Sequence, residues 1–247
     1  MKCWKMCFTV NVNIIKEELE RRYGTDLIDH DNYRPSYYYH AHSLPDMPVV
    51  YKTKSEEKSI SLFKWGLIPG WVRSEEEANR IRYMTFNAKA ETLSEKPSFS
   101  RAFKRSRCIV PVSGFFEWQH IPGRKQPWYI YNPDEPVLSL AGLYDRWSMP
   151  GEGNDIYTFS IITTAANQLL AEIHNTKKRM PMILARDNED KWLESDSTEE
   201  LANLLRPLPD NILSAHKISP LIGNSRVNRN IPELIEPYTP PEDQPLF

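Results

Sequence analysis

The chain has 247 residues, of which 40% are hydrophobic and 26% are charged, and its formal net charge is −2. This composition is typical of a soluble globular protein that is long enough to bury a substantial core. No apolar run approaches the roughly 18 residues of a membrane-spanning helix, and the N-terminus shows no signal-peptide pattern. The three cysteines do not indicate a disulfide scaffold. We therefore expect a cytoplasmic protein that is neither secreted nor inserted in a membrane.

Basic residues are concentrated in short segments. Residues 96–107 include five basic side chains and no acidic one, and smaller basic groups lie at 177–179 and 226–229. Each group alone is typical of a solvated surface. Together they can line one positive groove in a nearly neutral protein, as a nucleic acid would require.

The apolar pattern predicts many short strands and a few short helices. Apolar and β-branched residues at 6–13 predict a first strand, and the spacing of Ile15, Leu19 and Tyr23 predicts a helix. The segment 29–48 is rich in Tyr, His and Pro and predicts a loop. Further strands are predicted at 48–54, 58–65, 107–112, 115–120, 127–132, 137–144 and 156–163. Further helices are predicted at 97–104, 166–174, 188–194 and 198–206.

This order of elements predicts an α+β fold around a curved sheet. No internal repeat and no flexible linker divides the chain, so we expect a single domain. Only the proline-rich segment after Glu236 is typical of an extended, loosely held tail.

Two polar residues have surroundings that suit acid–base chemistry. Glu117 lies among aromatic residues in the segment 114–118 (GFFEW), where desolvation would raise the pKa of its carboxyl group. The same alternation is also typical of an outward-facing strand residue. His174 ends a predicted short helix, where either a catalytic or a purely structural role is open. Cys7 and Cys108 are, by residue type, most often small buried apolar side chains.

Eight segments, in this order, resemble the SRAP family of SOS response-associated peptidases, or abasic-site-processing proteins. The segments are MCFTV (6–10), WGLIPGW (65–71), FNAKAET (86–92), RCIVPVSGFFEW (107–118), KQPWYIY (125–131), TFSIITTAAN (158–167), EIH…RMPMIL (172–184) and GNSRVN…PELIEP (223–237). The resemblance implies a single SRAP-type α+β domain at 7–237, with a barrel-like, mostly antiparallel β core and short flanking helices. Residues 1–6 are then an N-terminal extension, absent or removed in the active form, and 238–247 an extended tail.

The resemblance implies a protein of the DNA damage (SOS) response that reacts with abasic sites in single-stranded DNA and needs no cofactor. In the family, a chain-terminal cysteine offers a free amine and a thiol, which close a thiazolidine ring on the aldehyde of the opened sugar. Residue by residue, Cys7 matches this nucleophile and Asn87 the residue that positions it. Glu117 matches the general acid/base, and His174 the residue that stabilises the sugar oxygen and moves its proton.

The resemblance also implies a DNA groove in which cations hold phosphates and aromatic rings stack on unpaired bases. Its candidate residues are Trp65, Trp71, Lys89, Arg101, Arg107, Asn224 and Arg226. We expect a monomer that is nucleoid-associated when it is bound to DNA. The last four residues, 244–247 (QPLF), loosely resemble peptides that dock on a sliding clamp.

The chain departs from the family pattern in four places. Phe8-Thr9 stands where the family has Gly-Arg, and Lys89 replaces an arginine. The segment 37–41 (YYYHA) replaces the family's Tyr-Asn-x-x-Pro, and 176–178 (TKK) adds about three residues after His174. These departures affect DNA contact rather than the four catalytic positions.

Three other interpretations stay open. A Cys/His thiol peptidase would need a thiolate and a base but no free amine, whereas the SRAP resemblance implies peptidase and lyase-like activities that accompany the crosslinking reaction. A non-catalytic module would only hold single-stranded DNA. A metal site from Cys3, Cys7, His40 and His42 would match zinc spacing loosely.

Six residues precede Cys7, so its nitrogen is part of a peptide bond in the printed chain. Either translation begins at Met6 and methionine removal frees Cys7, or the chain begins at Met1 and is trimmed after Met6 by its own active site. We favour a start at Met6, because Met6-Cys7 reproduces the family's opening.

Overall fold

Five strands close into a barrel at the centre of the computed structural model, which describes residues 8–149, 151 and 153–240. The strands are β3 (Asp46–Lys52), β4 (Lys58–Trp65), β6 (Arg107–Val112), β9 (Leu138–Ser148) and β10 (Asp155–Ala165). They pair in the order β10-β4-β3-β6-β9, and β9 pairs back with β10. Among these five, only β4 and β10 run parallel. The predicted α+β fold with a barrel-like, mostly antiparallel core is confirmed.

A second sheet packs beside the barrel and contains the first strand of the chain. Its order is β13 (Ser214–Lys217), β8 (Arg124–Tyr131), β7 (Gly114–Ile121), β1 (Thr9–Val12) and β2 (Ser36–His40). The chain passes from the barrel into this sheet between β6 and β7. Gly114 is required there, because a Cβ atom would lie 2.5 Å from the Tyr129 hydroxyl and 2.6 Å from the Ile130 carbonyl.

Short strands widen the barrel sheet. They are β5 (Asn87–Lys89) and β11 (Arg179–Pro181), which pair with β10, and β12 (Ile183–Leu184), which pairs with β9. The 3-10 helices are η1 (His30–Asn32), η2 (Ala41–Ser43), η3 (Ala90–Thr92), η4 (Arg186–Asn188), η5 (Pro220–Gly223) and η6 (Pro232–Ile235).

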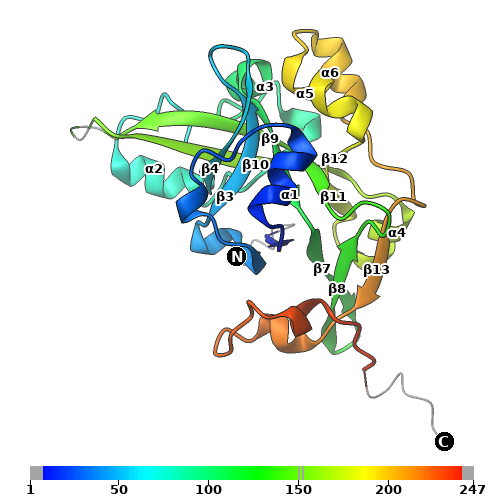
Figure 1. The fold of residues 1–247 in the computed structure, drawn as a ribbon. Coiled ribbons are helices and arrows are strands. Elements are labelled where there is room, and N and C mark those ends of the chain that lie inside the picture. The colour runs from blue at the N-terminus through cyan, green and yellow to red at the C-terminus, as the bar shows by residue number, and fades with distance from the viewer. Residues whose placement is uncertain (1–7, 150, 152, 241–247) are drawn as a thin grey trace, which may run out of the picture.

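The α-helices are short and lie outside the sheets, as Figure 1 shows. They are α1 (Lys16–Tyr23), α2 (Glu75–Arg82), α3 (Ser100–Arg105), α4 (Gln168–Ile173), α5 (Glu189–Glu194) and α6 (Thr198–Leu204). Side-chain caps begin α2, α4 and α6: the side chains of Ser74, Asn167 and Ser197 each accept a backbone N–H three residues on. None of the described helices is long and apolar enough to cross a membrane.

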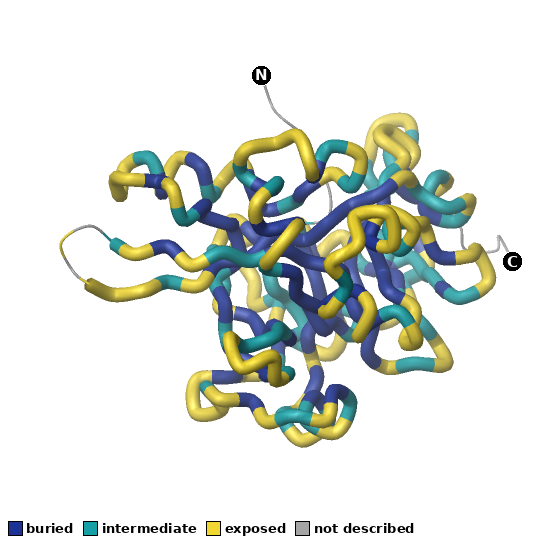
Figure 2. The backbone as a smooth tube through the Cα atoms, turned by 90° about the horizontal axis from the view of Figure 1, so that it is seen from above, coloured by how far each residue is buried: buried dark blue, intermediate teal, exposed yellow. Residues whose placement is uncertain are grey.

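The hydrophobic core fills the barrel, and exposed residues lie mainly on loops and helix surfaces (Figure 2). Trp65 and Phe159 are fully buried and stack with their ring centroids 5.9 Å apart. Removing each of these side chains from water contributes about 2–3 kcal/mol. The ends of β9 and β10 project from this body as a hairpin (Figure 2).

The predicted strands and helices correspond to observed ones, with boundaries that differ by a few residues. The prediction that 29–48 is a loop is wrong, because this segment contains β2 and the start of β3. Tyrosines favour strands, and β2 pairs with β1 so that Thr9 lies opposite His40. The charged helix α2 was not predicted. The extension 1–6 and the clamp-like residues 244–247 lie outside the described residues, so what the sequence predicts for them stays a prediction.

Candidate functional site

Glu117 and His174 line the same cavity, which has a volume of about 180 Å³. Glu117 lies on β7 and is 4% exposed, and His174 directly follows α4 and is 7% exposed. The other residues that line the cavity are Trp118, His120, Lys125, Thr176 and Lys177. A carboxyl group and an imidazole that line one small cavity can exchange protons with a group bound between them.

The hydrogen bond of His174 determines which of its ring nitrogens is available. Nδ1 lies 3.1 Å from the carbonyl oxygen of Arg179. Because a carbonyl oxygen only accepts, Nδ1 carries the proton, and Nε2 of the neutral ring can accept one. Burial lowers the pKa of His174, and the cations of Lys177 and Arg179 lower it further against the opposing effect of the hydrogen bond. At neutral pH the ring is therefore an uncharged proton acceptor.

Asn87 lies on β5, on the opposite side of β10 from β11. On β10, Thr163 lies opposite Lys89 of β5 on one side and opposite Pro181 of β11 on the other. Asn87 precedes Lys89 by two residues, and the carbonyl that holds His174 belongs to Arg179, two residues before Pro181. Because β5 runs parallel and β11 antiparallel to β10, Asn87 lies opposite Ile161 and Arg179 lies opposite Ala165, four residues further along β10.

Arg179 ties these strands together, and the sequence did not indicate this role. Its guanidinium donates to both carboxylate oxygens of Glu91 and to the Thr163 carbonyl at 2.7 Å. The hydrogen bond from Arg179 lowers the pKa of Glu91. The sequence signals were the basic group at 177–179 and the family-like segment 172–184, both of which contain Arg179. Its backbone carbonyl orients His174, so we regard Arg179 as a positioning residue.

The start of β1 lies between β7, which carries Glu117, and Phe86, which precedes Asn87. Val10 pairs with Phe115 in the antiparallel β1–β7 ladder, so each step toward the N-terminus on β1 is a step toward Glu117 on β7. On the other side, the ring of Phe8 contacts that of Phe86, with centroids 5.7 Å apart, and Phe86 immediately precedes Asn87. Cys7, the predicted nucleophile, lies outside the described residues, and its role stays a prediction.

Two of the predicted DNA-binding residues are not on the surface. Trp65 is fully buried, and its indole N–H donates to the Phe86 carbonyl at 2.9 Å. Arg107 is 6% exposed. Its guanidinium donates to the carbonyl oxygens of Phe103, Lys104, Trp192 and Ser195. We correct both assignments, because a base cannot stack on this indole and a phosphate cannot reach this guanidinium in the folded protein.

The other predicted DNA-binding residues, Trp71, Lys89, Arg101, Asn224 and Arg226, are exposed. Lys89 lies on β5 beside Asn87. Arg101 and Tyr157 line a separate cavity. Tyr157 lies on β10 six residues before Thr163, which pairs with Lys89, and this separation is about 20 Å along the strand. Asn224 and Arg226 lie in the segment before η6, which is tied to β2 by a hydrogen bond from Tyr37 N to Asn230 Oδ1. The structure therefore does not bring these residues into one group.

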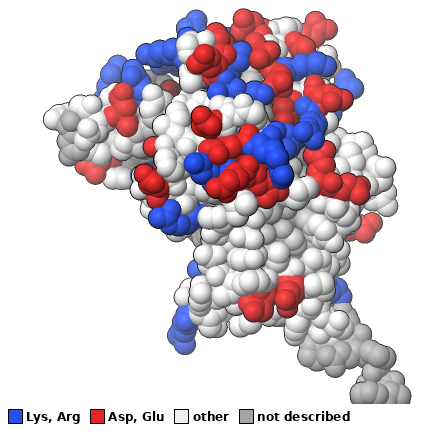
Figure 3. Space-filling view, in the orientation of Figure 1, with Lys and Arg blue, Asp and Glu red and all other residues white. Residues whose placement is uncertain are grey.

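Charged side chains are mixed in sign on the face that Figure 3 shows, and its lower part carries few of them. This face presents no continuous basic surface. Among the described residues, no three His, Cys, Asp or Glu side chains are arranged to hold a metal ion. His40 and His42 stack their rings at a centroid distance of 5.2 Å instead of converging on one point, and the two cysteines of that interpretation lie outside the described residues.

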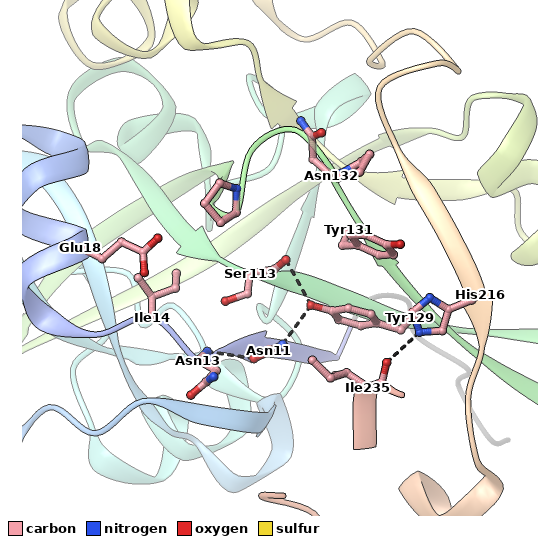
Figure 4. Close-up of a pocket in the computed structure, with 12 residues that line it drawn as sticks. Asn11, Asn13, Ile14, Glu18, Ser113, Tyr129, Tyr131, Asn132, His216 and Ile235 are labelled. Atoms are coloured by element: carbon pink, nitrogen blue, oxygen red, sulfur yellow. Dashed lines mark hydrogen bonds between the residues drawn. The ribbon is translucent and has the colours of Figure 1, made fainter. Parts of the chain in front are cut away.

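A larger cavity of about 450 Å³ lies between β1, β8 and β13 and is shown in Figure 4. Its buried polar groups are paired with one another. The Asn11 amide donates to the Tyr129 hydroxyl at 2.9 Å, and this hydroxyl donates to the Ser113 carbonyl at 3.2 Å. These bonds hold the strands in register, so we assign the cavity a structural role.

Together, the barrel, the second sheet and the cavity shared by Glu117 and His174 define a single-domain α+β protein with two buried ionisable side chains in one cavity beside its first sheet. Residues 6–225 match the sequence model of the SOS response associated peptidase (SRAP) family. The chain belongs to this family.

Its relatives include proteins from bacteria and vertebrates. The abasic site processing protein YoqW of Bacillus subtilis is 41% identical over 182 residues, which are 72% of this chain and 77% of that protein. The abasic site processing protein HMCES of Xenopus tropicalis is 32% identical over 228 residues, which are 81% of this chain and 66% of that protein.

Solved structures share the fold. A crystal structure of a protein from Bacteroides thetaiotaomicron aligns with a TM-score of 0.88 at 40% identity and covers 94% of this chain and 100% of that one. A protein from Bordetella bronchiseptica, 21% identical, aligns with a TM-score of 0.73 over 86% of this chain and 100% of that one.

Proposed function

We propose that this protein processes abasic sites in single-stranded DNA by forming a covalent thiazolidine through Cys7 as its first residue. The observation that carries the proposal is the cavity shared by Glu117 and His174, beside the strand that follows Cys7. Two relatives named abasic site processing proteins support the substrate class.

The reaction requires two proton-transfer stages. The α-amine of Cys7 adds to the sugar aldehyde, and the resulting hydroxyl leaves as water once it is protonated, which gives an imine. The thiol then adds to the imine carbon, and its proton passes to the nitrogen. We assign the protonation of the leaving hydroxyl to Glu117. As the sugar ring opens to the aldehyde, His174 Nε2 accepts the proton of the anomeric hydroxyl and passes it to the ring oxygen, and Asn87 positions the cysteine and the sugar.

A Cys/His thiol peptidase is the second candidate, and the family's description as a peptidase favours it. Its site would use the same neutral imidazole of His174 as the base for a thiol. Self-cleavage after Met6 and a lyase-like opening of the DNA strand would be activities of this same site.

The deciding experiment uses a chain that begins with Cys7 and abasic single-stranded DNA. We expect an adduct that survives a denaturing gel, and none from Cys7→Ala. Acetylation of the α-amine, with the thiol left free, should abolish the adduct. An acetylated chain that still forms it would refute the aminothiol mechanism, and peptide cleavage by that chain would favour the peptidase.

A further inference from the structure

The barrel opens to the surface at the end where β3 turns into β4. Trp65 and Phe159 form a fully buried layer inside the barrel. Two residues earlier on the same two strands, and therefore on the same face, Phe63 and Tyr157 stack with their ring centroids 5.1 Å apart. Phe63 is 2% exposed, whereas Tyr157 is 38% exposed. The interior of the barrel therefore becomes accessible at this second layer of rings.

A cavity of about 830 Å³ lies over this second layer, and we call it the barrel mouth. Its floor consists of Tyr51, Tyr144 and Tyr157. The ring centroids of Tyr51 and Tyr144 lie 4.9 and 5.3 Å from that of Phe63. Its walls come from the β3–β4 turn, α3 and the projecting β9–β10 hairpin (Figure 2). Ligand sites often lie in the mouths of β-barrels and have volumes of about 300–1,000 Å³, so this cavity has the size of a small-molecule site.

Four basic side chains line the barrel mouth: Lys52, Lys54, Arg101 and Arg146. Two of them are already paired. Lys52 lies 3.2 Å from a carboxylate oxygen of Glu194, and Arg146 lies 2.9 Å from one of Asp155. Lys54 and Arg101 are exposed and form no ion pair with another described residue. These two cations are therefore available to a ligand.

Asp145 is the only acidic residue among the described ones that line the barrel mouth. Both of its carboxylate oxygens accept backbone N–H groups, one from Gly70 at 2.8 Å and one from Arg146 at 2.9 Å. These hydrogen bonds hold the carboxylate against the backbone and compensate part of its charge. Because Lys54 and Arg101 are unpaired, the barrel mouth favours an anionic ligand.

An aromatic floor with unpaired cations beside it suits a ligand that combines a flat ring with a phosphate. We propose that the barrel mouth binds a nucleotide, with its base on Tyr157 and its phosphate on Lys54 and Arg101. Every base offers a π-face, so this stacking does not select one base. Tyr157 lies on β10 six residues, or about 20 Å, from Thr163, which accepts a hydrogen bond from Arg179 of the candidate site. The inference is therefore independent of the proposed function.

The test titrates the full chain with ATP and measures the heat of binding by calorimetry. Tyr157→Ala should weaken binding about 5- to 100-fold, because the base loses its stacking partner. Tyr157→Phe, which keeps the ring, should bind normally. Arg101→Ala should weaken binding about 10-fold, because the phosphate loses a charged hydrogen bond. Arg105→Ala is the matched control and should bind normally, since Arg105 is exposed on the same helix as Arg101 and does not line the cavity.

A second titration identifies the source of the nucleotide, with a single-stranded oligothymidine that has no abasic site and cannot form an adduct. If the same substitutions also weaken oligothymidine binding, the ligand is a nucleotide unit of DNA. If they weaken only ATP binding, it is a free nucleotide.

Two results would overturn the inference. One is the absence of binding to both probes, or affinities for both that neither Tyr157→Ala nor Arg101→Ala changes. The other is inorganic triphosphate that binds as tightly as ATP, since the base would then contribute nothing. Arg101→Ala alters an exposed side chain on α3, so it remains informative if Tyr157→Ala does not fold.

Discussion

The Thr9 hydroxyl lies 2.9 Å from Nδ1 of His40, a contact that joins β1 to the neighbouring β2. Burial, together with the nearby His42 and Arg229, lowers the pKa of His40 to about 4, although a hydrogen bond with the Phe8 backbone opposes this effect. The imidazole is thus held neutral in the folded protein.

The lowered pKa of His40 predicts a loss of stability in acid. Below its usual pKa of about 6.5, His40 binds a proton in the unfolded chain but not in the folded one. The free energy of unfolding should therefore fall as the pH drops from 7 to 4, with up to about 3 kcal/mol due to His40. Denaturant titrations across this range measure the slope. His40→Asn should flatten it and His30→Asn should not, and equal slopes for both variants would contradict the assignment.

Glu117 provides the test of proton transfer. Glu117→Gln keeps the size of the side chain but cannot donate or accept the proton, so the covalent step with abasic DNA should slow by about 10²- to 10⁴-fold. Binding to single-stranded DNA that contains a tetrahydrofuran abasic analogue, which has no aldehyde and cannot react, should not change. Single-turnover kinetics on a denaturing gel measure the rate. The control is Glu172→Gln, at an exposed position on α4, and an unchanged rate in Glu117→Gln would leave Glu117 a structural residue.

Arg226 and Arg107 should behave differently, although both were predicted to bind DNA. Arg226 is exposed, so Arg226→Ala should reduce the slope of log affinity against log salt by about 0.7, the value for one phosphate contact on single-stranded DNA. Arg107→Ala removes four hydrogen bonds to carbonyl oxygens, two of them buried and two partly buried, and should cost about 3–5 kcal/mol of stability. Binding isotherms at several salt concentrations and denaturant titrations separate these effects. A normally stable Arg107→Ala with a reduced salt slope would restore Arg107 as a DNA contact.

The sequence predicted the barrel strands because their apolar and β-branched residues alternate or run continuously, which is a local signal. It did not predict β2, because Tyr and His in 36–40 favour a strand only once β1 lies beside them. The prediction that Trp65 and Arg107 bind DNA was wrong because both side chains are buried. Residue type alone does not show which side of a strand faces the core.

The site was only partly predictable, because several of its contacts join residues that are far apart in the sequence. Glu117 was marked by its aromatic neighbours and His174 by resemblance, but Lys125 joins their cavity through its pairing with His120 across β7 and β8. Arg179 acts through a bond to Glu91, which is 88 residues away in the chain. Such partners are set by strand register, which no short segment of the sequence contains.

The six residues before Cys7 give the last prediction. In the full chain the Cys7 nitrogen is an amide, which cannot add to an aldehyde to form an imine, so the intact extension should abolish the adduct. A chain that begins at Met6 should lose its methionine and form it. Intact-mass measurement establishes which residue comes first in each preparation, and whether a chain expressed from Met1 is trimmed after Met6. The matched control is Cys7→Ala in the chain that begins at Met6. If the untrimmed chain, verified by mass, forms a stable adduct with abasic DNA, the α-amine is not the nucleophile.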